Sequence, residues 1–126
     1  TASGKVSEGT GACLFIVRDG KLITPDTNSD ILESITRETV MRIGREMLGL
    51  DVVERSVDRS ELYAADEAFL CGSGWEVVPV REVDRIALGN GEVGPMTRRV
   101  QDAYFSLVRG EVLDHPAWRS PVWQTK

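Results

Sequence analysis

Two short apolar runs separated by Asp-Gly constrain the fold of this 126-residue chain more than any other feature. Residues 14–17 (Leu-Phe-Ile-Val) have a composition typical of a strand, and residues 22–24 form a second run that Pro25 ends. Asp19 and Gly20 lie between the runs and are the residue types that a tight hairpin turn prefers. The sequence therefore predicts an antiparallel hairpin near the start of the chain.

The next segment, residues 30–37, is predicted to open the longest helix of the chain. Asp30 and Glu33 have the spacing of a capping box, and Ser34 is a second candidate for the N-cap. Apolar residues then recur at roughly helical spacing up to Leu50, with Gly49 as the expected terminator. The first N–H groups of a helix have no partner within it and lie at the positive end of its dipole, so this end suits an anion such as a phosphate.

Further strands are expected at residues 52–57, 68–71 and 76–80. Pro79 places the last of these at an edge or a bulge. A short helix is expected at residues 59–63. Strands and helices are thus mixed, which predicts an α/β (mixed α+β) domain. The chain contains no Walker pattern, and its one GxGxxG spacing, residues 89–94, follows a turn-rich stretch rather than a strand, so neither a P-loop nor a Rossmann site is supported.

The last third of the chain contains a turn-rich stretch, a helix and a tail. Residues 84–92 are rich in turn formers, and Gly94-Pro95 then begins a second helix that Gly110 ends. Apolar residues recur along one face of that helix: Met96, Val100, Ala103, Tyr104 and Leu107. The tail is predicted to be extended, with an aromatic and proline-rich set of residues: His115, Pro116, Trp118, Pro121 and Trp123.

Length and composition exclude several classes of protein. The chain is long enough for one domain with a core, its net charge is −5, and it has no basic cluster, which argues against a nucleic-acid partner. No apolar run approaches the length of a membrane span. Cys13 and Cys71 form no CxxC pair, which argues against a zinc site or a disulfide scaffold and favours a reducing compartment such as the cytoplasm.

Three places could carry chemistry. Glu8 lies in a glycine-rich turn, where a buried carboxylate would need a cationic partner such as a protonated pyridine nitrogen. Ile35 and Thr36 offer N–H groups at the helix start, and the turn at residues 73–74 offers a hydroxyl and open backbone to a phosphate or a carboxylate. Each has an ordinary alternative, because most turn glutamates are solvated and most helix starts and loops bind nothing.

The order of the motifs along the chain is more specific than any one of them. They comprise residues 7–17 (SEGTGACLFIV), 31–37 (ILESITR), 61–69 (ELYAADEAF), 79–81 (PVR) and 94–97 (GPMT). Together they resemble the C-terminal half of the class IV aminotransferases and are most similar to the branched-chain amino acid aminotransferases. The resemblance runs from about Val6 to the tail.

This resemblance implies the C-terminal large domain of a fold-type IV pyridoxal phosphate enzyme, in which strands form a pseudo-barrel with packed helices. In the family, the glutamate that matches Glu8 contacts the pyridine nitrogen, and the leucine that matches Leu32 packs against the ring. The residues matching Ile35 and Thr36 hold the phosphate, and the one matching Ser73 serves both the phosphate and the substrate. The implied cofactor is pyridoxal 5'-phosphate.

The implied reaction moves an amino group between a branched-chain or similar hydrophobic amino acid and 2-oxoglutarate, with Ser73 and Gly74 at the substrate carboxylate. D-amino acid aminotransferases and aminodeoxychorismate lyases share this cofactor site and remain alternatives. The sequence departs from the family where Ser73-Gly74 replaces Thr-Ala, where Trp75 replaces a small residue, and where Cys13 replaces Asn. Trp75 would either narrow the substrate pocket or turn away from it.

The family's Schiff-base lysine has no match among Lys5, Lys21 and Lys126, so we expect no catalytic residue and no metal ligand within residues 1–126. The resemblance implies that an N-terminal segment of the same precursor, present as a separate chain, supplies the lysine, and that the assembled enzyme is a homodimer. A degenerate, non-catalytic cofactor-binding domain is the alternative. Thr1 raises the further hypothesis of self-cleavage, although proteolysis would also produce such an end.

Overall fold

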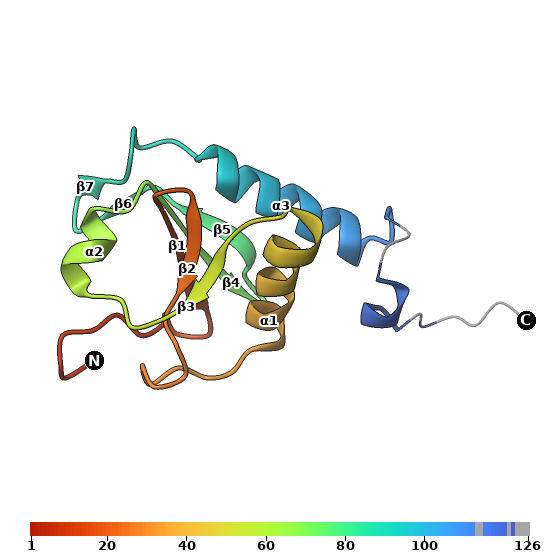
Figure 1. The fold of residues 1–126 in the computed structure, drawn as a ribbon, viewed down its shortest axis with the longest axis horizontal. Helices are drawn as coiled ribbons and strands as arrows, with labels where there is room; N and C mark the ends of the chain where they lie inside the picture. Colours follow the sequence, from red (N-terminus) through yellow and green to blue (C-terminus); the bar gives the residue numbers. More distant parts are fainter. Residues whose placement is uncertain (113–114, 121, 123–126) are drawn as a thin grey trace, which may run out of the picture.

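The computed structural model describes residues 1–112, 115–120 and 122, and its centre is a five-stranded sheet in the order β3-β2-β1-β4-β5 (Figure 1). The strands are β1 (Cys13–Arg18), β2 (Lys21–Thr24), β3 (Val52–Glu54), β4 (Glu67–Gly72) and β5 (Glu76–Val80). Within this sheet the β2–β3 pair is parallel and the other three pairs are antiparallel. The sheet is open, with β3 and β5 at its edges, so the mixed α/β class is confirmed whereas the described strands do not close into a pseudo-barrel.

The predicted hairpin joins β1 and β2. Arg18 pairs with Lys21, and Asp19 and Gly20 between them adopt positive φ angles of 51° and 73°. These angles are those of the tight turn that matches the twist of two antiparallel strands. The Asp-Gly pair therefore sets the register of the first two strands, as the sequence predicts.

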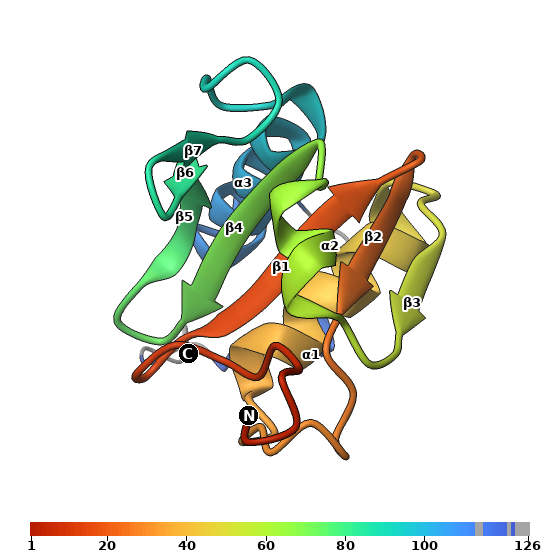
Figure 2. The same cartoon turned by 90° about the vertical axis from the view of Figure 1, so that its left-hand side faces the viewer.

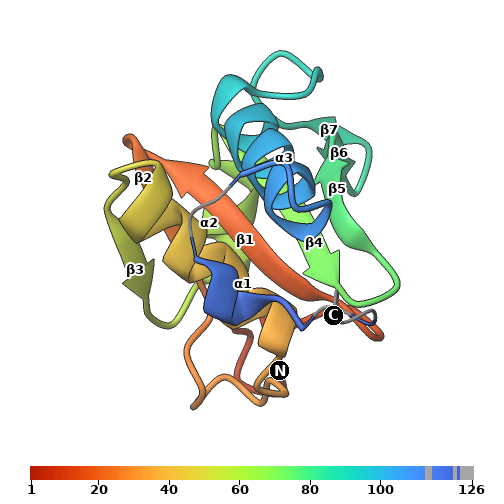
Figure 3. The same cartoon turned by 90° about the vertical axis from the view of Figure 1, so that its right-hand side faces the viewer.

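Strand β1 is buried on both faces because a hydrophobic core lies on each side of the sheet at this strand. On one face Phe15 stacks on Phe69 of β4, with ring centroids 5.1 Å apart, and this core is covered by α1 (Ile35–Arg42) and α3 (Pro95–Val108) (Figure 3). On the other face Leu14 and Ile16 form a second core with residues near α2 (Arg59–Tyr63) (Figure 2).

The first long helix differs from the prediction in its cap and in its length. Asp30 has a positive φ of 56° and Ser34 is the N-cap, its Oγ accepting the Arg37 N–H at 3.2 Å, so the Asp30–Glu33 capping box does not form. Helix α1 continues as a π-helical turn, η1 (Ile43–Met47), and stops at Gly49 as predicted. The longest helix among the described residues is instead the 14-residue α3.

Helix α3 begins against the buried carboxylate of Glu67, the first residue of β4. Both oxygens of Glu67 accept hydrogen bonds from the first turn of α3: Oε1 from Met96 N at 3.0 Å, and Oε2 from Thr97 N at 2.7 Å and Thr97 Oγ1 at 2.6 Å. A carboxylate at this position satisfies N–H groups that the helix cannot satisfy itself and complements its dipole. Gly94, the N-cap, leaves the space that the carboxylate fills.

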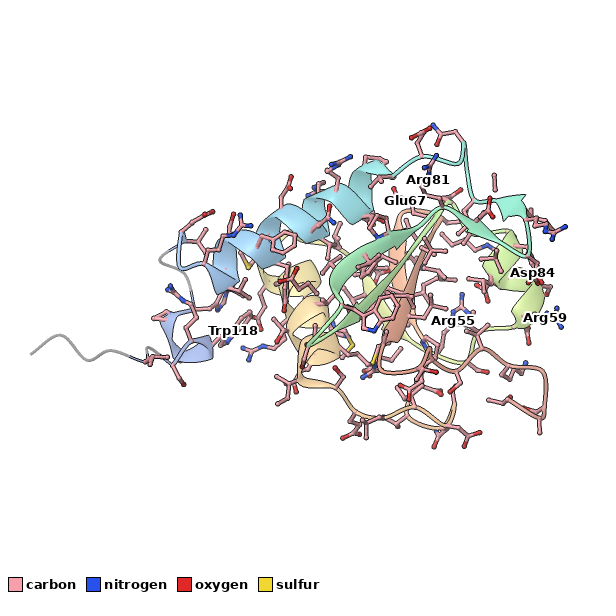
Figure 4. All side chains as sticks on the ribbon, turned by 180° about the vertical axis from the view of Figure 1, so that it is seen from behind. Arg55, Arg59, Glu67, Arg81, Asp84 and Trp118 are labelled. Carbon is pink, nitrogen blue, oxygen red and sulfur yellow. The ribbon has the colours of Figure 1, made fainter. Side chains whose placement is uncertain are left out.

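Two regions differ from the sequence prediction in detail. The turn-rich stretch contains a small hairpin of β6 (Glu82–Val83) and β7 (Ile86–Ala87), tied to α2 by Arg59 and Asp84 (Figure 4). The tail is not extended at Pro116–Trp118, which form a 3-10 turn (η2) whose Trp118 ring lies 4.1 Å from the Arg42 guanidinium carbon. Pro121 and Trp123 lie outside the described residues, and none of the helices within the described ranges has the length and apolarity of a membrane span.

Candidate functional site

A cavity of about 390 Å³ lies where the N-terminal turn, the loop before α1 and the β4–β5 turn meet. Five of the six predicted site residues line it: Glu8, Leu32, Ile35, Ser73 and Gly74. These residues come from three segments that are far apart in the sequence. The structure thus gathers around one space residues from two of the motif stretches, 7–17 and 31–37, together with the turn at residues 73–74.

Glu8 lies on one side of the cavity with half of its carboxylate in use. Its Oε2 accepts the Leu32 N–H at 3.2 Å and lies 3.9 Å from the Cys13 thiol. Its Oε1 has no hydrogen-bond partner in the described part of the chain, so it can accept a bond from a ligand. Ser7 fixes the same loop by donating its hydroxyl to Asp30 O at 2.9 Å.

The N-terminus of α1 lies on another side of the cavity. Ser34 and Ile35 both line the space, and Ile35 is the first helical residue, so its N–H has no acceptor within the helix. The Ile35 side chain is 86% exposed and contributes little to the core. Thr36, the sixth predicted residue, is buried and is not among the residues that line the cavity.

The β4–β5 turn brings open backbone to the cavity. A Cβ atom on Gly72 would lie 2.7 Å from the Gly11 carbonyl oxygen, so these two backbone segments pack in direct contact. A Cβ atom on Gly74 would meet no described atom within 4 Å, which leaves a cradle beside Ser73. Trp75 is not among the lining residues; its indole nitrogen lies near Gly11, so the ring does not fill the cavity.

These features suit a ligand with two different ends. The α1 N-terminus and the Ser73-Gly74 turn favour an anionic group, whereas Glu8 favours a cationic or N–H-bearing group. Of the described lysines, Lys5 pairs with Asp58 and Lys21 lies 3.6 Å from Asp51, and neither lines the cavity. Within the described ranges no group of three His, Cys, Asp or Glu side chains is placed to hold a metal ion.

Two cysteines line the cavity, although the sequence analysis assigns neither of them to the candidate site. Cys13 and Cys71 both line the space and both are free thiols. Burial raises the pKa of both thiols, that of Cys71 to about 12, and Arg37 opposes this effect at each. The sequence signal that could have identified the two cysteines is the alternation of side chains along β1 and β4, which directs both of them to the face of the sheet with the cavity.

The raised pKa of Cys71 makes stability depend on pH in the alkaline range. The unfolded chain releases the Cys71 proton above the ordinary pKa of a thiol, whereas the folded chain keeps it up to a pKa of about 12. The free energy of unfolding is therefore unaffected by this group below the unfolded-state pKa, and it falls as the pH rises from there towards the folded-state pKa. We expect the free energy of unfolding to fall by about 2 kcal/mol more for the wild type than for Cys71→Ala between about pH 8.5 and 10.5. Urea denaturation at both pH values measures this, and an equal fall in both proteins would contradict it.

Known proteins share both the sequence and the fold of this chain. A model of the amino-transferase class IV family matches residues 1–83. The chain is 47% identical over 122 residues to a probable branched-chain-amino-acid aminotransferase of Aquifex aeolicus and 44% identical to the branched-chain-amino-acid aminotransferase of Escherichia coli. These matches cover 97% of this chain but 39% of each relative, so the chain spans about two fifths of their length.

Solved structures agree with these matches. The crystal structure of the branched-chain amino acid aminotransferase from Thermobaculum terrenum, in its pyridoxal phosphate form, matches with a TM-score of 0.93 and 53% identity over 97% of this chain and 40% of that one. The Escherichia coli enzyme matches with a TM-score of 0.92 and 44% identity, over 97% of this chain and 41% of that one. The chain belongs to the amino-transferase class IV family.

Proposed function

We propose that this chain forms the cofactor-holding part of a pyridoxal phosphate-dependent aminotransferase acting on branched-chain or similar hydrophobic amino acids with 2-oxoglutarate. The observation that carries the proposal is the placement of the Glu8 carboxylate and the open N-terminus of α1 around one cavity. The relatives named branched-chain-amino-acid aminotransferases support the choice of substrate.

The cavity fits the two polar ends of the cofactor. The Ile35 N–H at the start of α1, with that of Thr36 behind it, would bind the phosphate, and Ser73 would add a hydroxyl. The cradle at Gly74 leaves room for the substrate carboxylate. Leu32, whose side chain is 75% exposed, offers an apolar surface to the ring.

Glu8 would keep the pyridine nitrogen protonated by accepting its hydrogen bond at the free Oε1. Pyridoxal phosphate, when bound, supplies the electron sink that stabilises a carbanion at the substrate's Cα. The Leu32 N–H and the Cys13 thiol hold Oε2, so the carboxylate is oriented before any ligand enters. A fixed carboxylate favours the protonated ring without reorganisation at the moment of reaction.

The reaction also needs an amine close to the cofactor. The described lysines form ion pairs away from the cavity, so we propose that an N-terminal segment of the same precursor supplies the lysine and that the assembled enzyme is a homodimer. The free thiols of Cys13 and Cys71 are consistent with a reducing compartment, which we propose is the cytoplasm.

Fragment complementation tests the proposal. The chain is mixed with the part of the Thermobaculum terrenum enzyme that precedes the matched region, and transfer from L-leucine, L-isoleucine or L-valine to 2-oxoglutarate is measured. We expect activity with the wild-type chain and about a 10- to 100-fold lower kcat/KM with Glu8→Gln, because one hydrogen bond to a charged group is worth about 1.5–3 kcal/mol.

The matched control is Glu82→Gln, which makes the same change on exposed β6. Assembly of the two fragments is followed by gel filtration. Assembled fragments without transamination would contradict the proposed activity and favour a degenerate domain. Activity with D-amino acids, or release of pyruvate from aminodeoxychorismate, would replace the substrate class and leave the cofactor assignment intact.

A further inference from the structure

The two cysteines face each other across neighbouring strands. Cys13 is the register partner of Cys71 in the antiparallel β1–β4 pair. Side chains of directly opposed residues point to the same face of a sheet, and their Cα atoms lie about 4.5–5.5 Å apart. That spacing lies within the range of about 4.4–6.8 Å that a disulfide spans. Both residues belong to the same core cluster and line the same cavity.

The backbone around the pair is held firmly. Gly72, next to Cys71, packs so closely on the turn before β1 that a Cβ atom there would lie 2.7 Å from the Gly11 oxygen. Beyond the cysteines, the register continues through Leu14–Leu70 and Phe15–Phe69. The register of β1 and β4 therefore holds Cys13 and Cys71 opposite each other. The separation of Cys13 and Cys71 in the sequence hides this pairing.

The thiol of Cys13 also takes part in shaping the cavity. Its Sγ lies 3.9 Å from Glu8 Oε2 and 3.9 Å from the Leu32 carbonyl oxygen, and so joins the turn before β1 to the loop before α1. Arg37, which is 4% exposed, places a positive charge that lowers the pKa of both thiols, although burial outweighs it. The cavity gives a small reagent a path to Cys13.

We propose that Cys13 and Cys71 are a disulfide-forming site: a small dialkyl disulfide that enters the cavity converts them to an intrachain disulfide, which releases Cys13 from Glu8 and Leu32 and weakens ligand binding. The site goes beyond the proposed function, because it makes the cavity sensitive to the redox state of its surroundings. The ligand affected is the one with an anionic group that the α1 N-terminus binds.

The chemistry is thiol–disulfide exchange in two steps. The Cys13 thiolate attacks one sulfur of the reagent, the reagent's S–S bond breaks, and its first half leaves as a thiolate. The Cys71 thiolate then attacks the Cys13 sulfur of this mixed disulfide and releases the second half. The two cysteines lose their protons and two electrons, and the reagent is reduced to two thiols. Since both pKa values are raised, the exchange is slow at neutral pH and accelerates as pH rises.

The test treats the reduced 126-residue chain with hydroxyethyl disulfide under native conditions. The chain is then unfolded in acid, and the remaining thiols are measured with N-ethylmaleimide and intact mass. We expect no maleimide adduct, a mass lower by two hydrogen atoms, and a joined peptide containing Cys13 and Cys71. The rate constant of disulfide formation should not change when the protein concentration is raised about tenfold, because the second step is intramolecular. Cys71→Ser should stop at a single mixed disulfide on Cys13.

Two results would overturn the site itself: both thiols persisting while the unfolded chain oxidises fully, or a wild-type mixed disulfide that Cys71 never resolves. Ligand binding is measured separately by titrating pyridoxal phosphate into the oxidised and the reduced chain. We expect at least a threefold weaker affinity in the oxidised chain, restored by dithiothreitol, and equal affinities would refute the proposed effect on the cavity. The mass measurement stands even if pyridoxal phosphate is not the ligand, so the two proposals fail separately.

Discussion

Gly94→Ala is expected to destabilise the chain by about 3–5 kcal/mol, since a new Cβ would force a buried carboxylate out of its hydrogen bonds. The added atom would lie 1.9 Å from the carboxyl carbon of Glu67. Gly94 has a φ of −74°, which alanine adopts readily, so the destabilisation comes only from the lack of space for the Cβ atom. Displacing Glu67 leaves the N–H groups of Met96 and Thr97 without acceptors.

Urea denaturation measures this loss, which is a large part of the 5–15 kcal/mol typical of a domain. Gly74→Ala is the matched control, because its Cβ would meet no described atom within 4 Å. Glu67→Gln should lose about 1–3 kcal/mol, since the amide keeps one acceptor oxygen. In the double variant that combines Gly94→Ala with Glu67→Gln, the loss of unfolding free energy should be smaller than the sum of the two single losses. Equal stabilities for Gly94→Ala and Gly74→Ala would show that the carboxylate does not hold the start of α3.

Ile35→Pro is expected to weaken phosphate binding about 10- to 100-fold without unfolding the helix, since one charge-assisted hydrogen bond is worth about 1.5–3 kcal/mol. Ile35 is the first residue of α1, where proline is favoured and only the N–H is removed. Ser34 before it has φ −103° and ψ 136°, an extended conformation that proline tolerates in its neighbour. The substitution therefore removes one donor and leaves the backbone in place.

The control for this variant is Ile35→Ala, which keeps the N–H and removes the exposed side chain. Affinity for inorganic phosphate and for pyridoxal phosphate is measured by titration calorimetry, and helix content by circular dichroism. Affinity should fall only in Ile35→Pro. If Ile35→Ala loses as much, the apolar side chain rather than the helix N-terminus holds the ligand.

Local chemistry was enough to predict some elements of the fold. The Asp19-Gly20 hairpin and the end of the first helix at Gly49 depend on residues whose backbone preferences are strong. The start of that helix was harder to predict, because two caps compete within a few residues. Ser34 takes the position since Asp30 adopts a positive φ in the loop before it, a conformation that the spacing of polar residues does not reveal.

The site was predictable only in part. The order of motifs led to Glu8 and to the Ser73-Gly74 turn, which the fold brings to one cavity. Contacts set by tertiary structure were missed: Glu67 caps a helix that lies distant in the sequence, and Cys13 meets Cys71 only through the register of two strands. Helix spacing gave no indication that Thr36 is buried and does not line the cavity.

Titration of pyridoxal phosphate into the chain tests most directly the proposal that this cavity holds the cofactor. We expect one molecule bound per chain, displaced by excess inorganic phosphate, and weaker binding in both Glu8→Gln and Ile35→Pro. Glu82→Gln and Ile35→Ala should bind like the wild type. Glu8→Gln should leave the affinity for inorganic phosphate unchanged, because that ligand lacks the ring. Absence of saturable binding, or binding that both Glu8→Gln and Ile35→Pro leave intact, would contradict the assignment of this cavity.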